Sequence, residues 1–276
     1  MKKSALFFDI DGTILSEITK EIPESALEAL NQAKKNGHKM YINTGRTYCN
    51  IPPQLRRFDF DGFLCGCGCY LVCNDEVVLE SHIEKKRGQD IIDMMYECKL
   101  DGILEGTEDA YFPIKRSRFE MLETTRRFFA KKGLGIEKYI DEGDIEYDKL
   151  FVYADEQSDK QKFFDFLKAD MEVIDRGDNA YEIAQKPFSK ATACEFMRKR
   201  LGLELDQVYV FGDSSNDLSM FEYAQHTIAL GAHSEVLDPY TEFVTKTVED
   251  DGIAYAMKHY GLILVEKTPI SSGGEE

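Results

Sequence analysis

Residues 5–15 read Ala-Leu-Phe-Phe-Asp-Ile-Asp-Gly-Thr-Ile-Leu, and this stretch decides the fold. The apolar run before Asp9 has the length and aromatic content of a buried strand. Because side chains two residues apart in a strand point to the same side, Asp9 and Asp11 can project together from its end. Gly12 then allows the chain to turn sharply. The pattern predicts a strand that brings two carboxylates to one place.

Two neighbouring carboxylates repel each other unless a cation lies between them, and no basic residue is close to Asp9 and Asp11 in sequence. A hard divalent ion such as Mg²⁺ is the natural partner, because it takes oxygen ligands and often shares them with a phosphate. A strand that ends in an ordinary polar turn is the alternative that this pair alone leaves open. An EF-hand calcium loop is excluded, because Gly12 comes too early in the motif and a strand precedes it.

The composition limits the possible partners. The chain has 276 residues, 43% of them hydrophobic, enough for one large or two modest domains. The formal net charge of −17 argues against nucleic acid and anionic membrane surfaces, but not against a small anionic substrate in a locally positive pocket. Lys2 and Lys3 lead directly into the first strand, so we expect no signal peptide, and no apolar run has membrane-spanning length.

The seven cysteines are an odd number, which argues against a disulfide framework and favours a reducing, cytoplasmic location. Four of them are close in sequence, and their one-residue spacing lies on a strand-like stretch without a second Cys/His pair at zinc spacing. We therefore expect packing residues instead of a metal site for Cys65, Cys67, Cys69 and Cys73.

The next elements predict a parallel sheet. Residues 24–36 carry apolar side chains at helical spacing, and residues 38–43 form a short strand that ends at Thr44-Gly45. A strand, a helix and a strand in this order make a parallel unit, so Thr44 lies at the same sheet edge as Asp9. A hydroxyl followed by Gly at a helix N-terminus suits an anion, although an ordinary helix cap is the alternative.

A third strand end carries polar groups. Residues 208–211 form a clear apolar strand that ends in Gly-Asp213-Ser-Ser-Asn216-Asp217, and Lys190 begins the helix before it. Because these strand ends share one edge, the sequence predicts an acidic metal cup with hydroxyl, amide and lysine donors around it, as a phosphate site needs.

Four motifs resemble, in order and spacing, the signature motifs of the haloacid dehalogenase (HAD) superfamily: Asp9-Ile-Asp11-Gly12-Thr13, Thr44-Gly45-Arg46, Lys190, and Gly212-Asp213-Ser-Ser-Asn216-Asp217. The large insert between the second and third motifs resembles that of the Cof-type subfamily, which has a C2B cap. The resemblance covers nearly the whole chain. It implies an α/β fold: a Rossmannoid three-layer core with a mainly parallel sheet, and an inserted α+β cap.

The resemblance also implies an activity, that of a Mg²⁺-dependent phosphatase, a phosphoric monoester hydrolase, acting on a small phosphorylated metabolite such as a sugar phosphate. Asp9 would be the nucleophile that forms an aspartyl-phosphate, and Asp11 the general acid and base. The neighbouring Asp9 charge would raise the proton affinity of Asp11. The metal would be held by Asp9, the backbone carbonyl of Asp11, Asp213 and, in the first or second shell, Asp217. The phosphate would be held by Thr44, Gly45, Lys190 and Asn216.

The predicted domains follow from the change in texture along the chain. Mixed short strands and helices between residues 83 and 186 favour an α+β insert that acts as the cap, and residues 1–82 and 187–276 would form the catalytic core. Residues 141–148 are acidic and predict a solvated loop, and residues 271–276 predict a disordered acidic tail. Three basic residues of the insert are substrate-binding candidates by charge only, with solvated surface as the alternative: Arg116, Arg118 and Lys149.

Two positions depart from the family's pattern. Cys67-Gly68 stands where members usually carry Asn-Gly, and Gly231-Ala232-His233 stands where many carry Gly-Asn-Ala. Both affect the expected substrate more than the chemistry, and His233 is expected to be an exposed loop residue. A phosphomutase that uses the same aspartyl-phosphate and a non-catalytic phosphate-binding protein are the alternative functions. We expect a monomer or weak homodimer.

Overall fold

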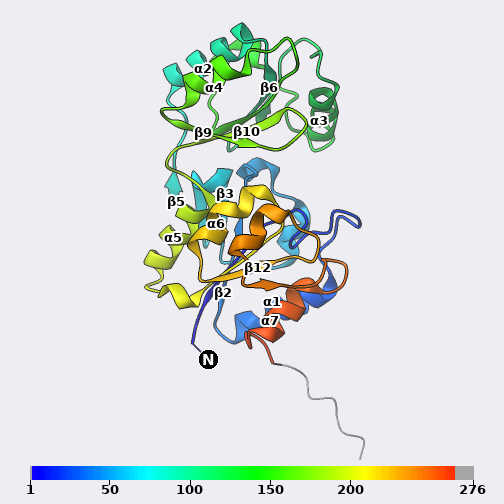
Figure 1. Ribbon diagram of the computed structural model, residues 1–276, viewed down its shortest axis with the longest axis vertical. Coiled ribbons are helices and arrows are strands. Elements are labelled where there is room, and N and C mark those ends of the chain that lie inside the picture. The colour runs from blue at the N-terminus through cyan, green and yellow to red at the C-terminus, as the bar shows by residue number, and fades with distance from the viewer. Residues whose placement is uncertain (1, 265–276) are drawn as a thin grey trace, which may run out of the picture.

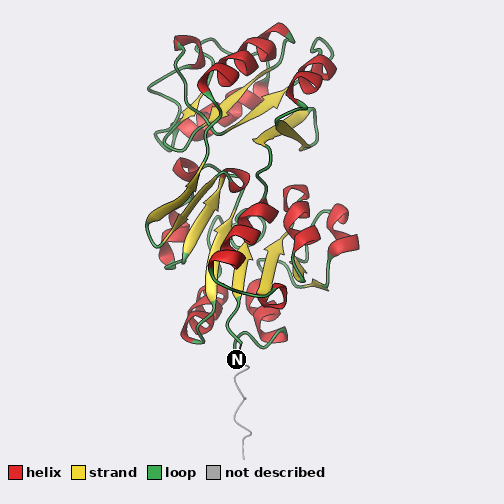
Figure 2. Ribbon diagram, turned by 90° about the vertical axis from the view of Figure 1, so that its left-hand side faces the viewer, coloured by secondary structure: helices red, strands yellow, loops and turns green. Residues whose placement is uncertain are grey.

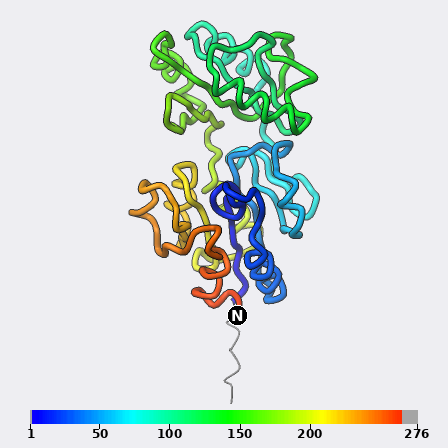
Figure 3. Tube along the Cα trace, turned by 90° about the vertical axis from the view of Figure 1, so that its right-hand side faces the viewer, coloured from blue at the N-terminus to red at the C-terminus, as the bar shows by residue number. Residues whose placement is uncertain are grey.

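The computed structural model describes residues 2–264, which form two units, each built on its own β-sheet (Figures 1 and 2). The predicted acidic tail lies outside these residues. The chain passes between the two units twice, near residues 82 and 186 (Figure 3). The predicted domain boundaries at 82/83 and 186/187 therefore fall where the chain crosses, and they stay predictions. Within residues 2–264, no helix is long and apolar enough to cross a membrane.

The larger unit, called the core unit here, is built on an eight-stranded sheet with the order β13-β12-β11-β1-β2-β3-β4-β5. Its first six strands are parallel, and β4 and β5 form an antiparallel hairpin. This confirms the α/β class with a mainly parallel sheet. The strands are β1 (Ala5–Phe8), β2 (Lys39–Asn43), β3 (Gly62–Cys65), β4 (Tyr70–Cys73), β5 (Glu76–Glu80), β11 (Val208–Gly212), β12 (His226–Ala229) and β13 (Phe243–Val244).

Helices cover both faces of this sheet because its central strands are apolar on both sides. In β1, Leu6 and Phe8 pack with one helix pair and Ala5 and Phe7 with the other, and all four are fully buried. The first pair is α1 (Glu24–Lys35) and α7 (Gly252–His259), and the second is α5 (Lys190–Arg200) and α6 (Leu218–Tyr223).

The smaller unit, called the insert here, is built on an antiparallel sheet with the order β7-β6-β8-β10-β9. Helices α2 and α4 pack on the side of this sheet that is turned away from the core unit (Figure 1). Its elements are α2 (Lys85–Glu97), β6 (Asp101–Glu105), β7 (Ala110–Tyr111), α3 (Glu120–Ala130), β8 (Lys149–Tyr153), α4 (Lys160–Leu167), β9 (Met171–Asp175) and β10 (Ala180–Gln185).

Two stretches differ from what their sequences indicate. The apolar residues from Phe60 to Cys69 are typical of one strand, but β3 ends at Cys65 and residues 66–68 turn with φ values of 58°, 57° and 94°. A chain with positive φ cannot continue a strand. The acidic stretch 141–148 was expected to be a solvated loop. Its residues Asp141, Glu142, Asp144 and Glu146 are exposed, but Tyr147 and Asp148 are each only 1% exposed. Asp148 accepts a hydrogen bond from Thr107 Oγ1 and contacts His82 Nδ1, so both oxygens of this buried carboxylate have partners.

Candidate active site

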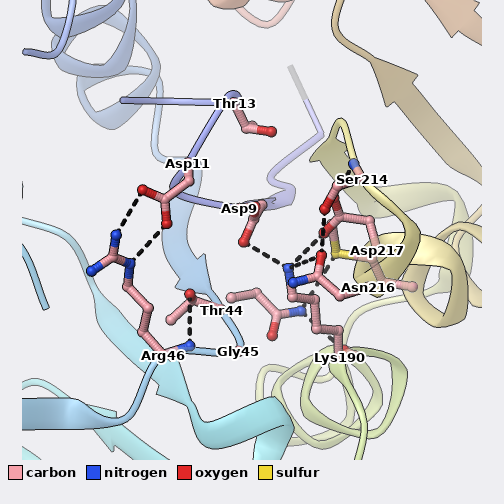
Figure 4. A network of polar contacts seen from close by, with 12 residues as sticks. Asp9, Asp11, Thr13, Thr44, Gly45, Arg46, Lys190, Ser214, Asn216 and Asp217 are labelled. Carbon is pink, nitrogen blue, oxygen red and sulfur yellow. Dashed lines mark hydrogen bonds and ion pairs between the residues drawn. The ribbon is translucent and has the colours of Figure 1, made fainter. Parts of the chain in front are cut away.

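The carboxyl ends of β1, β2 and β11 lie side by side and place the predicted polar residues together (Figure 4). β1 is in parallel register with both neighbours, so the residues that follow Phe8, Asn43 and Gly212 emerge at one sheet edge. The backbone N–H of Asp9 continues the ladder by donating to Phe211 O at 3.0 Å. The sheet register itself therefore fixes where the Asp9 carboxylate stands.

Lys190 lies between two buried carboxylates. Its Nζ is 2.6 Å from Asp9 Oδ1 and 2.6 Å from Asp217 Oδ1, and it donates to Asn216 Oδ1 at 3.3 Å (Figure 4). The lysine is 1% exposed, as its place at the start of α5 directs the side chain inward. Asn43 fixes that helix start by donating from Nδ2 to Lys190 O at 2.9 Å.

The loop after β11 is held by Asp217. Its Oδ2 accepts the backbone N–H groups of Asp213 and Ser214 at 2.9 and 3.0 Å. Asp213 in turn accepts a hydrogen bond from Thr13 Oγ1 at 2.8 Å, which ties the loop to the turn after β1. Asp217 is fully buried, so it orients the loop from beneath while Asp213 remains partly accessible.

Burial and mutual repulsion raise the pKa values of two carboxyl groups in this site. Burial raises the pKa of Asp9 to about 7, against the attraction of Lys190. Burial, with the nearby charges of Asp9 and Asp217, raises the pKa of Asp213 to about 8. The two carboxylates beside Lys190 outweigh its burial and raise the pKa of its ammonium group, which is thus charged at neutral pH. One lysine does not fully compensate the negative charge here.

The acidic cluster fits a divalent cation. Asp9, Asp213 and Asp217 each offer a carboxylate oxygen, and these three oxygens lie within 4.8 Å of one another. They are the one such group of His, Cys, Asp and Glu side chains within residues 2–264. Hard oxygen ligands with excess negative charge are what Mg²⁺ requires, so the donor set suits the predicted metal.

Asp11 points away from this cluster toward Arg46 (Figure 4). Arg46 donates from Nε and Nη2 to the two carboxylate oxygens at 2.7 and 2.8 Å. Burial raises the pKa of Asp11, but the hydrogen bonds and charge of Arg46 outweigh it, so that this pKa is lowered. The expectation that the neighbouring Asp9 raises the proton affinity of Asp11 is wrong for this arrangement, because the arginine contacts the carboxylate directly.

Thr44 and Gly45 form the floor beside Asp9. Thr44 is 2% exposed, and its Oγ1 accepts the backbone N–H of Arg46 at 3.1 Å. Gly45 is required by close packing against the insert, because a Cβ there would lie 2.8 Å from Glu182 Oε1. Both residues face a cavity of about 380 Å³ that also contains Asp9 and Asp213.

Residues of the insert line the other side of this cavity. Lys149 of β8 donates from Nζ to Gly45 O at 2.9 Å and forms a buried ion pair with Glu182 of β10. A second contact crosses the units where Lys132 Nζ donates to Asn50 Oδ1 at 2.8 Å. Among the three basic candidates of the insert, Lys149 is therefore no solvated surface residue, since it is 3% exposed and lines the cavity.

The other two basic candidates of the insert lie outside the cavity. Arg116 pairs with Glu120 and Arg118 pairs with Asp155, and neither arginine lines the cavity. Sequence reasoning missed Glu182 altogether, and Lys149 could be found only by its charge. The available signal was a single charged residue in each of two mainly apolar strands, Lys149 in β8 and Glu182 in β10.

The four neighbouring cysteines behave as packing residues. All seven cysteines are free, and Cys65, Cys67, Cys69 and Cys73 are buried. Burial raises the pKa of each of their thiols, and none belongs to the group that could hold a metal within residues 2–264. Their placement agrees with the expected packing role.

Known proteins resemble this chain over most of its length. A family model described as haloacid dehalogenase-like hydrolase matches residues 6–257. The chain belongs to this family. The hydrolase is 27% identical over 272 residues to YkrA of Bacillus subtilis, which covers 95% of this chain and 100% of that protein. It is 24% identical over 279 residues to phosphatase YwpJ of the same organism, with 91% and 97% covered.

Solved structures agree in fold. The hydrolase superposes on the HAD subclass IIB sugar phosphatase BT4131 with a TM-score of 0.79 and 25% identity, covering 95% of this chain and 100% of that one. The phosphatase BT1666 from Bacteroides thetaiotaomicron gives a TM-score of 0.83 at 24% identity, with 95% and 96% covered. The predicted family is confirmed, and the protein is a phosphoric monoester hydrolase.

The two departures from the family's motifs have defined places in this hydrolase. Cys67 has a φ of 57°, and its thiol donates to Glu182 Oε1 at 3.3 Å, so the position usually held by Asn contacts the insert. His233 is half-buried instead of exposed, and both ring nitrogens are engaged, with Leu230 O at 2.6 Å and Asp238 at 2.9 Å. His233 does not line the cavity.

Replacing Gly12 by alanine is expected to lower the hydrolase's activity about 100-fold by displacing Asp213. Gly12 has a φ of +75°, and a Cβ there would lie 2.5 Å from Asp213 Oδ2. Gly133→Ala is the matched control, because Gly133 has a φ of +77° with no atom within 4 Å. Both variants carry a similar backbone strain, on the order of 1 kcal/mol. Equal activity of the two variants in a phosphate-release assay would contradict this assignment.

Proposed function

We propose that the protein is a Mg²⁺-dependent phosphatase that hydrolyses a small phosphorylated metabolite, such as a sugar phosphate or a similar phosphomonoester, through an aspartyl-phosphate on Asp9. One observation carries the proposal: the Asp9 carboxylate lines a cavity of about 380 Å³ beside two further carboxylates and Lys190. The likeness to the phosphatases YwpJ and BT4131 supports the reaction.

The proposed metal site consists of the carboxylates of Asp9 and Asp213, with Asp217 beside or behind them, and the backbone carbonyl of Asp11. When bound, Mg²⁺ would neutralise the repulsion between these carboxylates and an anionic phosphate. Asp217 already accepts three hydrogen bonds within the protein, from Lys190 and two backbone N–H groups. Its main contribution is therefore to keep Asp213 in place.

Asp9 acts as the nucleophile. One of its oxygens forms a bond to phosphorus while the bond between phosphorus and the leaving oxygen breaks. Lys190 holds Oδ1 of the carboxylate at 2.6 Å, which orients the other oxygen for attack in line with the leaving group. The acyl phosphate is then hydrolysed when water attacks phosphorus, and the Asp9 carboxylate is released.

Asp11 moves the protons of both steps. It donates a proton to the leaving oxygen and later takes one from the attacking water. Because Arg46 holds Asp11 in its ionised form, the donating role requires this ion pair to open when substrate enters. The substrate's phosphate is a competing anion for the guanidinium group, which supplies a reason for the pair to open.

Four groups bind the transferred phosphoryl oxygens: Thr44 Oγ1, the backbone N–H of Gly45, Lys190 Nζ and the Asn216 amide. They act where negative charge is spread in the transition state. The insert excludes water from the reaction and selects the substrate, as expected for a cap. A cytoplasmic location and a monomer or weak homodimer stay predictions from sequence.

Metal removal tests the proposed function. Phosphate release from p-nitrophenyl phosphate is expected with Mg²⁺ and to disappear with EDTA. Asp213→Asn should need at least about tenfold more Mg²⁺ for half-maximal rate, because a direct ligand is lost. Asp206→Asn is the control, since Asp206 pairs with Lys2 on the surface and is 48% exposed. Undiminished release by the wild-type enzyme in EDTA would refute the metal requirement.

A further inference from the structure

One face of the insert sheet forms the roof of the cavity. Side chains alternate along a strand, so Lys149, Phe151 and Tyr153 of β8 point to the same face. Ile103 and Glu182 lie opposite Phe151 on the two neighbouring strands. The alternate residues point to the other face and pack under α2 and α4. The roof therefore has a charged end near Gly45 and an apolar part farther away.

The charged end of the roof is partly paired within the protein. Lys149 bonds to Gly45 O and Glu182, with Glu105 Oε1 at 3.9 Å. Glu182 also accepts from the thiol of Cys67 at 3.3 Å. These groups are at most 9% exposed, and they join the roof to the floor of the cavity. Two acceptors have no hydrogen bond among the described residues: the Glu105 carboxylate, and Glu182 Oε2, which lies 3.9 Å from Arg176 Nη1.

Two residues in the apolar part of the roof are accessible, Phe128 and Phe151, and the others are buried behind them. This part is lined by Ile103, Phe128, Phe129, Phe151 and Tyr153. Phe128 of α3 is 48% exposed, and the rings of Phe151 and Tyr153 lie 5.3 Å apart between centroids. The Tyr153 hydroxyl is near Thr125 Oγ1 at 3.3 Å, so the polar end of that ring is also engaged. The atoms that a leaving group meets here are mostly ring carbons.

We propose that the leaving group of the substrate carries a flat aromatic or heteroaromatic ring that packs against Phe128 and Phe151. This inference rests on the proposed phosphatase reaction. A flat ring gains dispersion and burial against aromatic side chains without requiring hydrogen bonds. A hexose in the same place would turn some of its hydroxyl groups toward the rings of Phe128 and Phe151, which offer no hydrogen-bond partner, and unsatisfied buried hydroxyls cost binding energy.

Two phosphate esters of similar size test the proposal. Pyridoxine 5′-phosphate and glucose 6-phosphate each carry a phosphorylated CH₂OH group on a six-membered ring, but only the first ring is flat. Binding is measured calorimetrically to Asp9→Asn with Mg²⁺, so that no turnover is needed. We expect pyridoxine 5′-phosphate to bind at least about tenfold more tightly. Equal affinity, or tighter binding of glucose 6-phosphate, would overturn the proposal.

Substitutions in the roof test which side chain gives the preference for a flat ring. Phe151→Leu in the same background should bring the ratio of the two dissociation constants close to one, whereas Phe151→Tyr keeps an aromatic face and should retain the preference. Phe166→Leu is the control, because Phe166 belongs to α4 and its ring contacts the Arg87 guanidinium group, away from the roof. A preference that survives Phe151→Leu unchanged would contradict the assigned surface. Wild-type enzyme that binds both ligands but releases no phosphate would refute the phosphatase reaction and leave the ring preference measurable.

Discussion

Asp9→Asn is expected to lower the rate of phosphate release by a factor on the order of 10⁴ or more, because the amide cannot form the acyl phosphate. The fold should persist. Asp9 is buried with its pKa raised to about 7, so the protein gains little stability from its charge, and an amide of the same shape can still accept from Lys190. Circular dichroism and thermal unfolding should therefore resemble those of the wild-type protein.

Asp59→Asn is the matched control for this substitution, because the Asp59 side chain is 93% exposed and lies outside the cavity. It should keep the wild-type rate. Substantial activity in Asp9→Asn, within about tenfold of the wild-type value, would show that water attacks the phosphate directly. That result would remove Asp9 from the role of nucleophile even if the metal requirement held.

Lys190→Met is expected to lower the free energy of unfolding by about 3–5 kcal/mol, because it leaves two buried carboxylates without their cation. Lys190 contacts both Asp9 and Asp217 at 2.6 Å, and methionine fills similar space without charge. Activity should also be lost, because a donor to the transferred phosphoryl group is missing. Urea unfolding followed by circular dichroism measures the stability change.

Mg²⁺ supplies an internal test of that explanation. If the lost stability comes from repulsion between carboxylates, added Mg²⁺ should restore part of it in Lys190→Met by binding the folded state. Lys199→Met is the control, since Lys199 lies on the same helix, is 64% exposed and pairs only with Glu195 in the described part of the chain. A Lys190→Met protein as stable as this control, with or without Mg²⁺, would mean that the buried carboxylates are not compensated by Lys190.

The sheet edge could be predicted because short-range rules determine it. A strand that ends in Asp9, followed by a helix and a parallel strand ending at Thr44, leaves little choice about which residues meet. The same reasoning placed Asp213 at that edge, and the register of β1 with β2 and β11 agrees with it. Lys190 could be placed because it begins a helix next to this sheet.

The pairing of Asp11 could not be predicted. Arg46 is 35 residues away, and its approach depends on the path of the chain after β2, where two short turns replace a regular helix. The burial of Lys149 could not be predicted either, because it depends on how the insert lies over Gly45. Contacts between units separated by about a hundred residues follow from tertiary packing, which local patterns do not encode.

The central claim is that Asp9 carries the phosphoryl group, and trapping that species tests it most directly. Asp11→Asn should accumulate it when mixed with Mg²⁺ and acetyl phosphate, because the leaving acetate needs no proton but the attacking water lacks its base. After an acid quench, mass spectrometry should find one phosphoryl group per chain on the peptide that contains Asp9, and none in the Asp9→Asn/Asp11→Asn double variant. Wild-type enzyme that releases phosphate from acetyl phosphate while Asp11→Asn stays unlabelled, or carries the label on another residue, would contradict the account.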